Sequence, residues 1–547
     1  MKLIRDILII SILIGITSCN EILDEPIYSF KTTSNSFLTE SDAFIAITNC
    51  YFQLDSYLMY SQQYWRMLET GSGGITRARY VTGNDDIELI AKKYLSTNNS
   101  VSDLWTGHYL VINTCNDALE GVSEMNNIKP EVKNSVMGEA LFLRSMQYFN
   151  MVRIWGGHIP LRLSSTKGLG NAYSGPSTEE AIYTQILSDL KTAAQLMPAT
   201  QTLKGRATKG AANALIAKVY LTMGSMKKYG EKYSSIEDKR FDFVTNPDAC
   251  YDSTRVYCQK VIGLYTLLND YASQFVVASK NSSESIFEVQ FTTGVRGSGN
   301  QIDAYVCPYT YGSCFSLGYG THRLTKKQYN DFNTAHPGDY RLESSIFGGF
   351  IGRFSQYTAA GVASNTGDIK KDSIFVWPNP KASTNEKWPY LYKFRDPAGT
   401  AANQHGNNFI YLRYADVLLM AAEAENEIGN TETACGYVDQ LMARARKANG
   451  TPRTIPTDWT GTGLSRDQFR LNIWNERHFE LLGEVHLWYD LVRTGQYAAY
   501  LKDHNDNYYT PFPTSEYEMP FLERNILFPI PNNELNQNNL LTQNYGY

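Results

Sequence analysis

The fold is decided by residues 414–450, which read YADVLLMAAEAENEIGNTETACGYVDQLMARARKANG. The first part is rich in alanine, leucine and glutamate, which favour a helix, and it ends at Gly429 and Asn430, residue types that commonly close one. A second helical run follows, in which Ala434 is small enough to let a neighbouring helix approach closely. The stretch therefore predicts two antiparallel helices joined by a tight turn.

Helix pairs recur downstream of this stretch. Ser465 and Gln468 predict a capping box at the start of another helix, and Gly483 separates that helix from a further helical run. Two helices in about 34 residues is the length of a tetratricopeptide unit, in which each pair buries its apolar faces against the next. The sequence thus predicts a mainly α fold with a scaffold of tetratricopeptide-like helix pairs.

Helical periodicity also dominates the N-terminal part, which we place at residues 19–268. Apolar residues recur at spacings of three and four in its first helix: Phe44, Ile47, Tyr51, Leu54 and Leu58. We expect Ser41 or Asp42 to cap this helix. Pro130 marks the start of a later one.

Two further boundaries can be read in the same part. Ser177 with Glu180 predicts a capping box, and Pro198 closes the helix that it opens. In the alanine-rich run that follows, three small residues let another helix approach: Ala211, Ala214 and Ala217. Gly224 then predicts the end of that helix.

The pattern changes in residues 269–408, which we predict to be a loop-rich insert carrying short strands. Its segment SIFEVQFTT alternates apolar and polar side chains in the order Phe287, Glu288, Val289, Gln290 and Phe291. This alternation predicts a half-buried strand. Long stretches without periodicity follow, and such loops are uncommon unless they carry function. We therefore expect the ligand site in this insert, and helix pairs with a tail in residues 409–547.

The N-terminus predicts a signal peptide over residues 1–18. Lys2 and Arg5 precede an apolar segment of about ten residues, which as a helix would rise only about 15 Å, half of a bilayer core. The sequence ITSC that ends at Cys19 fits a lipobox, so Cys19 is predicted to be acylated and to tether the chain to a membrane. The alternative is an ordinary secretory signal with an incidental cysteine.

The composition argues against several kinds of partner. The chain has 547 residues and a formal charge of −5, and it has no basic run to neutralise nucleic-acid phosphates. No cysteine has metal-site spacing, and we expect no metal or cofactor. Cys250 could pair with Cys258, and Cys307 with Cys314, but the sequence leaves both pairings open. Tyrosine outnumbers phenylalanine, 38 to 24, which suits either surfaces that stack on polar ligands or a helical core with wet edges.

Several blocks in a fixed order resemble the SusD/RagB family of outer-membrane nutrient-binding lipoproteins. The blocks are CNEILDEP from Cys19, EALFLRSMQYFNMVRIWGGHIPL from Glu139, RLTKKQYNDFNTAHPGDYR from Arg323, YLRYADVLLMAAEAENEIG from Tyr411, NERHFELLGEVHLWYDLVRTG from Asn475 and FPIPNNELNQNNLLTQNYGY from Phe528. The order of the blocks is specific, while each block alone is weak. Asn538 and Asn539 stand where the family tail often has Asn-Pro, and no segment between residues 60 and 100 matches a ligand-binding block.

The resemblance implies a cell-surface lipoprotein. Members bind oligosaccharides, or in some cases peptides, and deliver them to a TonB-dependent transporter of the SusC type. Glu21, Asp24 and Glu25 resemble the acidic export tag that sends such lipoproteins to the outside of the outer membrane. The resemblance implies no enzymatic activity and does not identify the glycan.

Two segments without core periodicity supply the candidate ligand-binding residues. In GNQIDAYVCPYTYGSCFSLGYGTHR, from Gly299, the candidates are Tyr305, Tyr309, Tyr311, Tyr319 and His322. In ITRARYVTGNDD, from Ile75, they are Arg77, Tyr80, Asn84 and Asp85. A pyranose lays its C–H face on an aromatic ring while its hydroxyls bond to polar side chains. The alternative for each tyrosine is packing within the loop.

We interpret most other conspicuous residues as scaffold. Charged residues on packed helices need partners, and this group comprises Glu476, Arg477, Glu480, Asp490 and Arg493. Three tryptophans fall in helical blocks and are predicted to be core: Trp105, Trp155 and Trp488. His478 and His486 lack the order of a zinc motif.

Enzymatic activity is the main competing hypothesis. The spacing of Glu476, Glu480 and Glu484 would let a helical glycoside hydrolase place paired carboxylates. Such a pair must flank a cleft at about 5 Å or about 6.5–9.5 Å, which spacing along one helix does not establish. We therefore predict no catalytic residues, with the hydrolase and a peptide-binding member of the family as alternatives.

Overall fold

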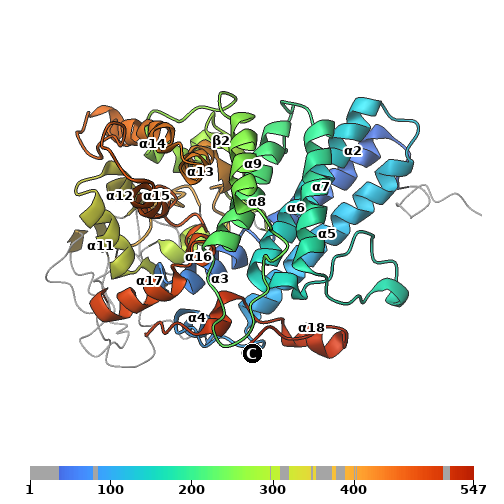
Figure 1. The fold of residues 1–547 in the computed structure, drawn as a ribbon. Helices are drawn as coiled ribbons and strands as arrows, with labels where there is room; N and C mark the ends of the chain where they lie inside the picture. The colour runs from blue at the N-terminus through green and yellow to red at the C-terminus, as the bar shows by residue number, and fades with distance from the viewer. Residues whose placement is uncertain are drawn as a thin grey trace, which may run out of the picture.

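The protein is mainly helical, as a computed structural model shows (Figure 1). The structure describes residues 36–77, 84–295, 297–307, 320–346, 349–352, 373–376, 389–399, 401, 403–508 and 518–547. The N-terminal helices are α2 (Glu40–Leu54), α3 (Gln63–Ser72), α4 (Asn84–Ile90), α5 (Asn99–Glu124), α6 (Pro130–Trp155), α7 (Glu179–Leu196), α8 (Lys209–Lys228) and α9 (Pro247–Gln259). The predicted mainly α class is confirmed.

The remaining elements are shorter. The insert and the C-terminal part contain the helices α10 (Ile302–Val306), α11 (Lys326–Ala335), α12 (Tyr340–Ser345), α13 (Tyr414–Glu427), α14 (Thr431–Ala445), α15 (Arg466–Glu480), α16 (Leu487–Arg493), α17 (Tyr497–Asp503) and α18 (Asn532–Gln537). The strands are β1 (Ile75–Arg77), β2 (Ser285–Val289), β3 (His322–Leu324), β4 (Gly349–Gly352), β5 (Ser373–Val376) and β6 (Phe409–Arg413). They form two-stranded antiparallel sheets, in which β1 pairs with β3, β2 with β6 and β4 with β5.

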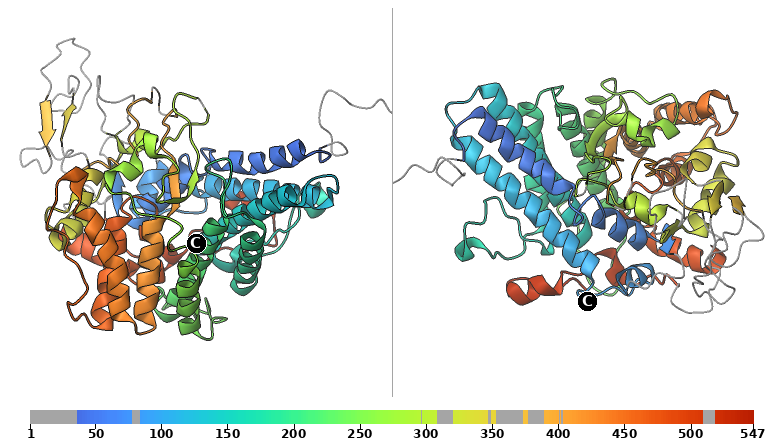
Figure 2. Two further views of the ribbon diagram at one scale, coloured as in Figure 1. Left: turned by 90° about the horizontal axis from the view of Figure 1, so that it is seen from above. Right: turned by 180° about the vertical axis from the view of Figure 1, so that it is seen from behind.

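The long helices pack as one stack of neighbours. From α5 to α9, each helix packs against the next one along the chain. Helix α13 packs against α9 as well as against α14 and α15, and it thereby joins the C-terminal helices to the N-terminal ones. In both views of Figure 2 the long blue to teal helices of the N-terminal part lie on one side and the orange C-terminal helices on the other. This arrangement is the predicted scaffold of helix pairs.

Two predicted helix caps were wrong by one to three residues. Thr39 caps α2, and its partner in the capping box is Asp42, whose carboxylate accepts from the Thr39 amide at 2.8 Å. Thr178, rather than Ser177, caps α7 through the Ala181 amide at 3.2 Å. In both cases several residues of types that cap helices lie next to one another in the sequence. The backbone conformation determines which of them is the cap. The capping box of Ser465 with Gln468 and the start of α6 at Pro130 are confirmed.

Gly224 does not end a helix, contrary to the prediction, because α8 continues through it to Lys228. A Cβ added at Gly224 would lie 3.1 Å from the Cβ of Cys250 and 3.2 Å from the carbonyl oxygen of Pro247. The glycine therefore permits the close approach of α8 and α9. Cys250 and Cys258 are both free thiols, so the disulfide left open between them is not formed. Cys314 lies outside the described residues.

The strand predicted at SIFEVQFTT is β2, but it is buried on both faces rather than half-buried. Glu288 is only 2% exposed, and its carboxylate accepts from the Asn281 amide at 3.0 Å and from the Asn408 side chain at 2.7 Å. The polar residue is therefore satisfied inside the protein, which alternation alone cannot reveal. Strand β2 lies inside the predicted insert and pairs with β6, which directly follows the insert in the sequence.

The three tryptophans predicted as core are buried. The ring centroids of Trp105 and Trp155 lie 5.1 Å apart in an edge-to-face contact, and the Trp155 indole donates to the Pro529 carbonyl at 3.0 Å. Trp488 packs in the same way on Phe528, with ring centroids 5.3 Å apart. These contacts attach the C-terminal tail to the helices.

Over the described part of the chain, every helix is too short or too polar to span a bilayer.

Candidate ligand-binding site

The structure brings the two predicted ligand-binding segments together. Strand β1, which follows α3, pairs antiparallel with β3. In this register Arg77 lies opposite His322. The two residues belong to segments that are far apart in the sequence. The register therefore places the start of one segment beside the end of the other in the folded chain.

Tyr305 is the predicted ligand-binding tyrosine whose surroundings the structure describes. It comes from α10, and its ring is half-buried against the edge of the His322 ring, with centroids 5.3 Å apart. The Arg66 guanidinium lies 5.9 Å from the Tyr305 ring centroid. The Thr321 amide donates to the Tyr305 carbonyl at 3.0 Å, which links α10 to β3. Tyr305 thus keeps part of a supported ring accessible.

His322 lies behind Tyr305, with no exposed surface. Its Nε2 is 3.7 Å from the Asp86 carboxylate, which also accepts from Arg66 at 2.7 Å. Burial by itself would raise the pKa of Asp86, but His322 and Arg66 together hold it below its usual value. The Trp65 ring packs on the other side of His322, with centroids 5.8 Å apart. In this structure His322 therefore positions the aromatic ring in front of it.

Asp85 helps to join α4 to α5. Its carboxylate accepts from the backbone amide of Asn99 at 3.2 Å and from the Asn99 side chain at 3.1 Å. For two other candidates the structure describes the backbone only, which puts Arg77 at the end of β1 and Asn84 at the start of α4. The remaining candidates lie outside the described residues: Cys19, Tyr80, Tyr309, Tyr311 and Tyr319.

Arg66 and Asp86 are not among the residues predicted from the sequence, although their ion pair supports the site. Arg66 lies in α3 and Asp86 in α4, and each looks like an ordinary charged residue on a helix. Only their joint contact with Tyr305 and His322 distinguishes them. Asp86 directly follows the candidate Asp85, but nothing in the sequence separates a buried aspartate from a partly exposed one at this point.

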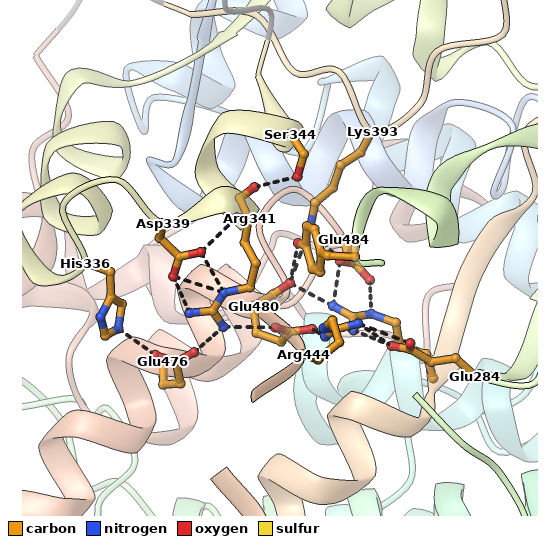
Figure 3. Close-up of polar contacts among 12 residues, drawn as sticks. Glu284, His336, Asp339, Arg341, Ser344, Lys393, Arg444, Glu476, Glu480 and Glu484 are labelled. Atoms are coloured by element: carbon orange, nitrogen blue, oxygen red, sulfur yellow. Dashed lines mark hydrogen bonds and ion pairs between the residues drawn. The ribbon is translucent and has the colours of Figure 1, made fainter. Parts of the chain in front are cut away.

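Glu476 and Glu480 lie on α15, and Glu484 lies in the turn after it. All three carboxylates belong to a buried ion cluster (Figure 3). Arg341 binds Glu476 at 2.5 Å and Glu480 at 3.0 Å. Arg413 binds Glu480 at 2.7 Å and Glu484 at 2.8 Å. A glycosidase needs a carboxylic acid with a raised pKa beside a cleft. These side chains are at most 5% exposed, so they form no such pair.

Two further basic residues complete the cluster. Arg444 binds Glu284 at 3.2 Å and also pairs with Glu480. Lys393 donates to Glu484 at 2.8 Å. Burial by itself would raise the pKa of Glu480, but three arginines hold it well below its usual value.

A second buried cluster contains the other charged residues predicted as scaffold. Arg477 binds Asp416 at 2.9 Å and Asp490 at 3.0 Å, and Arg493 binds Asp490 at 2.7 Å and Glu423 at 2.5 Å. These contacts join α13, α15 and α16. The scaffold interpretation of these residues is therefore confirmed. Among the described residues, no group of three histidine, cysteine or acidic side chains could hold a metal ion.

Comparison with known sequences now identifies the family. The profile of the SusD family matches residues 283–547, and a profile described as "Starch-binding associating with outer membrane" matches residues 47–221. The chain belongs to the SusD family. The family resemblance read from the order of the sequence blocks is confirmed.

SusD-like relatives match most or all of the chain. SusD-like protein P2 of Formosa agariphila is 27% identical over 558 residues, which cover 98% of each protein. SusD-like protein P25 of the same organism is 24% identical over 577 residues and covers both chains completely. A SusD-like protein of Bacteroides ovatus is 23% identical over 77% of this chain and 70% of its own length.

Solved structures of the SusD superfamily share the fold. A SusD homolog from Bacteroides thetaiotaomicron superposes with a TM-score of 0.76 at 21% identity, covering 94% of this chain and 99% of its own. A protein described as a laminarin-binding SusD-like protein gives a TM-score of 0.68 at 24% identity, with 93% and 100% coverage. A structure with a xylogluco-oligosaccharide gives 0.64 at 20% identity, with 91% and 98% coverage.

Proposed function

We propose that this SusD-family chain binds oligosaccharides and delivers them to a SusC-like, TonB-dependent transporter. The observation that carries the proposal is the pairing of β1 with β3, which brings two predicted ligand-binding segments together beside the half-buried Tyr305 ring. The outer-membrane, starch-binding description of the profile that matches residues 47–221 supports it. So do structural relatives described as binding laminarin or containing a xylogluco-oligosaccharide.

The chemistry of the described residues suits a neutral sugar. The C–H face of a pyranose can stack on the accessible part of the Tyr305 ring, while Arg66 and Asp85 offer hydrogen bonds to hydroxyl groups nearby. A few such contacts at about 1 kcal/mol each, less the cost of ordering, give a dissociation constant on the order of micromolar to millimolar. Weak binding suits delivery, since a tethered protein gains effective concentration and must release its ligand.

The proposal includes a lipid anchor at Cys19, a position on the cell surface and no catalysis. The lipobox and the acidic residues after it support the anchor and the surface position. The burial and pairing of Glu476, Glu480 and Glu484 argue against the hydrolase alternative at these carboxylates. Peptide capture remains the alternative within the family.

Calorimetric titration of the chain from residue 20 onward with laminarin and xyloglucan oligosaccharides tests the proposal. We expect binding without release of new reducing ends, and we expect Tyr305→Ala to weaken it about tenfold, the equivalent of about 1.4 kcal/mol. Tyr305→Phe keeps the ring and should retain most of the affinity. Tyr173→Ala, at an exposed tyrosine outside the site, is the matched control. Hydrolysis of the glycan, or preferential binding of oligopeptides, would contradict the proposal.

A further inference from the structure

A cleft lies on the N-terminal helices, apart from the candidate ligand-binding site. It has a volume of about 990 Å³ and is lined by the end of α7, the loop to α8, the start of α8, the end of α9 and strand β2. These elements lie side by side in Figure 1, where α7, α8, α9 and β2 are labelled. None of the residues that line the cleft belongs to the site around Tyr305.

The cleft gathers lysines that have no acidic partner. Four exposed lysines line it: Lys191, Lys204, Lys209 and Lys260. Among the described residues none of them forms an ion pair with a carboxylate. A fifth cation, Arg206, is already bound to Glu139 at 2.7 Å. Because the whole chain has a net charge of −5, this is a local excess of positive charge.

The acidic residue in the lining does not offset this charge at the surface. Glu288 is 2% exposed, and its carboxylate is occupied by the Asn281 amide and the Asn408 side chain. Unpaired ammonium groups beside a concave, partly enclosed surface attract anions from solution. The cleft is therefore built for a negatively charged ligand.

Aromatic rings lie between two of the lysines. The rings of Tyr220 and Tyr257 are stacked at 6.0 Å with an interplanar angle of 24°. Lys191 donates to the Tyr220 hydroxyl at 3.0 Å, and the Lys260 ammonium lies 4.2 Å from the Tyr257 ring centroid. Of these two tyrosines only Tyr257 lines the cleft, and its contacts with Tyr220 and with the Lys260 ammonium hold that ammonium at the edge of the cleft.

A third tyrosine, Tyr265, lines the cleft beside the start of α8. The Tyr265 hydroxyl lies 3.2 Å from the Thr208 side-chain oxygen, and a Cβ added at Gly210 would lie 2.5 Å from it. Gly210 is thus needed for Tyr265 to pack against the start of α8. Leu203 and Leu264, which also line the cleft, are 63% and 64% exposed. The cleft therefore combines apolar, aromatic and cationic surface.

We propose that this cleft binds an anionic oligosaccharide, one that carries uronate carboxylates or sulfate esters. The ligand class rests on the proposed glycan-binding function, but the site is separate from the one around Tyr305. The exposed side chains of Leu203 and Leu264 can contact the C–H groups of a sugar, and the lysines without an acidic partner match acid groups repeated along the saccharide. The volume is that of a pocket for a small ligand, which favours a saccharide over a protein surface.

Calorimetric titration of the chain from residue 20 onward tests the cleft with oligogalacturonate, a sulfated oligosaccharide, a neutral oligosaccharide of equal length and oligoglutamate. We expect the acidic saccharides to bind and the Lys191→Gln/Lys260→Gln double variant to weaken that binding at least tenfold. Salt should weaken it as well, because it screens exposed charges over about 10 Å at 0.1 M. Lys227→Gln, at an α8 lysine that pairs with Asp242 outside the cleft, should bind like the wild type.

The outcomes separate this inference from the proposed function. If neither acidic saccharide binds, if the double variant binds them like the wild type, or if oligoglutamate binds equally well, the inference about the cleft is overturned. Failure of the neutral oligosaccharides alone would overturn the function proposed for the Tyr305 site and leave the cleft supported. Circular dichroism of each variant verifies that a loss of binding does not come from unfolding.

Discussion

The N-terminal helices are joined by single buried ion pairs, such as Arg144 with Asp189 between α6 and α7, whereas the C-terminal helices share connected ion clusters. On α8, the small residues that face neighbouring helices are fully buried and carry no charge: Ala211, Ala214 and Ala217. In the C-terminal part, α13, α15 and α16 meet through buried arginine–carboxylate clusters. Apolar packing depends mainly on area and volume, whereas a buried ion cluster requires every partner in place.

The difference shows what the family motifs do. The charged motif residues Glu476, Arg477, Glu480, Asp490 and Arg493 all belong to the buried clusters (Figure 3 shows two of them). The candidate residues around Tyr305, and the lysines of the cleft between α7, α8 and α9, lie outside the family motifs. In this protein these recognisable charged residues therefore stabilise the scaffold, while the proposed ligand contacts lie in segments without a family motif.

Glu69 and Glu480 are both buried, but their pKa values shift in opposite directions. Glu480 is surrounded by Arg341, Arg413 and Arg444, and its pKa is below the usual value. Glu69 is also buried, but its carboxylate accepts from the Val485 amide at 2.6 Å, and none of the arginines that the structure describes forms an ion pair with it. Burial raises the pKa of Glu69 to about 7. The same side chain is thus ionised in one environment and protonated below neutral pH in the other.

The largest effect should follow the loss of one cluster cation. Arg413→Met leaves the carboxylates of Glu284, Glu480 and Glu484 with too few positive partners, so we expect the free energy of unfolding to fall by about 3–5 kcal/mol. Urea denaturation followed by circular dichroism measures it.

The matched control for that variant is an exposed pair. Arg255→Met breaks the contact of Arg255 with Asp252 on α9 and should cost about 0.5 kcal/mol or less. Similar losses in both variants would mean that the buried cluster contributes no more than a surface ion pair.

The next effect concerns pH. The pKa of Glu69 is about 7 when folded, against 4.5 as the ordinary value. Between these values the folded chain keeps a proton that the unfolded chain has lost, so the free energy of unfolding falls as pH rises from 4.5 to about 7. Glu69→Gln removes this dependence and should stabilise the protein by up to about 3 kcal/mol above pH 7.

Thermal unfolding across this pH range measures the Glu69 effect. Glu131→Gln, at an exposed residue in the first turn of α6, should leave the slope unchanged. An unaltered slope in Glu69→Gln would show that this carboxylate titrates like an exposed one.

The smallest effect is expected in the apolar region. Ala214→Leu inserts three carbon atoms where α8 is fully buried, and overpacking of this kind costs about 1–3 kcal/mol. The exposed Ala499→Leu on α17 is the control and should be nearly neutral. Urea denaturation checks both. If Ala214→Leu lowered the free energy of unfolding as much as Arg413→Met does, the N-terminal and C-terminal helices would not differ in their sensitivity to substitution.

The sequence by itself determined the helix pairs and the family. Periodicity, Pro130 and the capping box at Ser465 are local signals, since a helix and its cap involve residues at most four apart. Even the cap errors at Thr39 and Thr178 shifted a boundary without changing an element.

Only the tertiary structure decided which distant residues meet. Arg77 lies opposite His322, Arg66 approaches Tyr305, and Lys191 and Lys260 flank one pair of stacked tyrosines. Such contacts depend on the path of the chain through the helix stack, because contacts between separate elements have no fixed spacing in the sequence. For the same reason the strand at Phe287 could be predicted, whereas the burial of Glu288 on its other face could not.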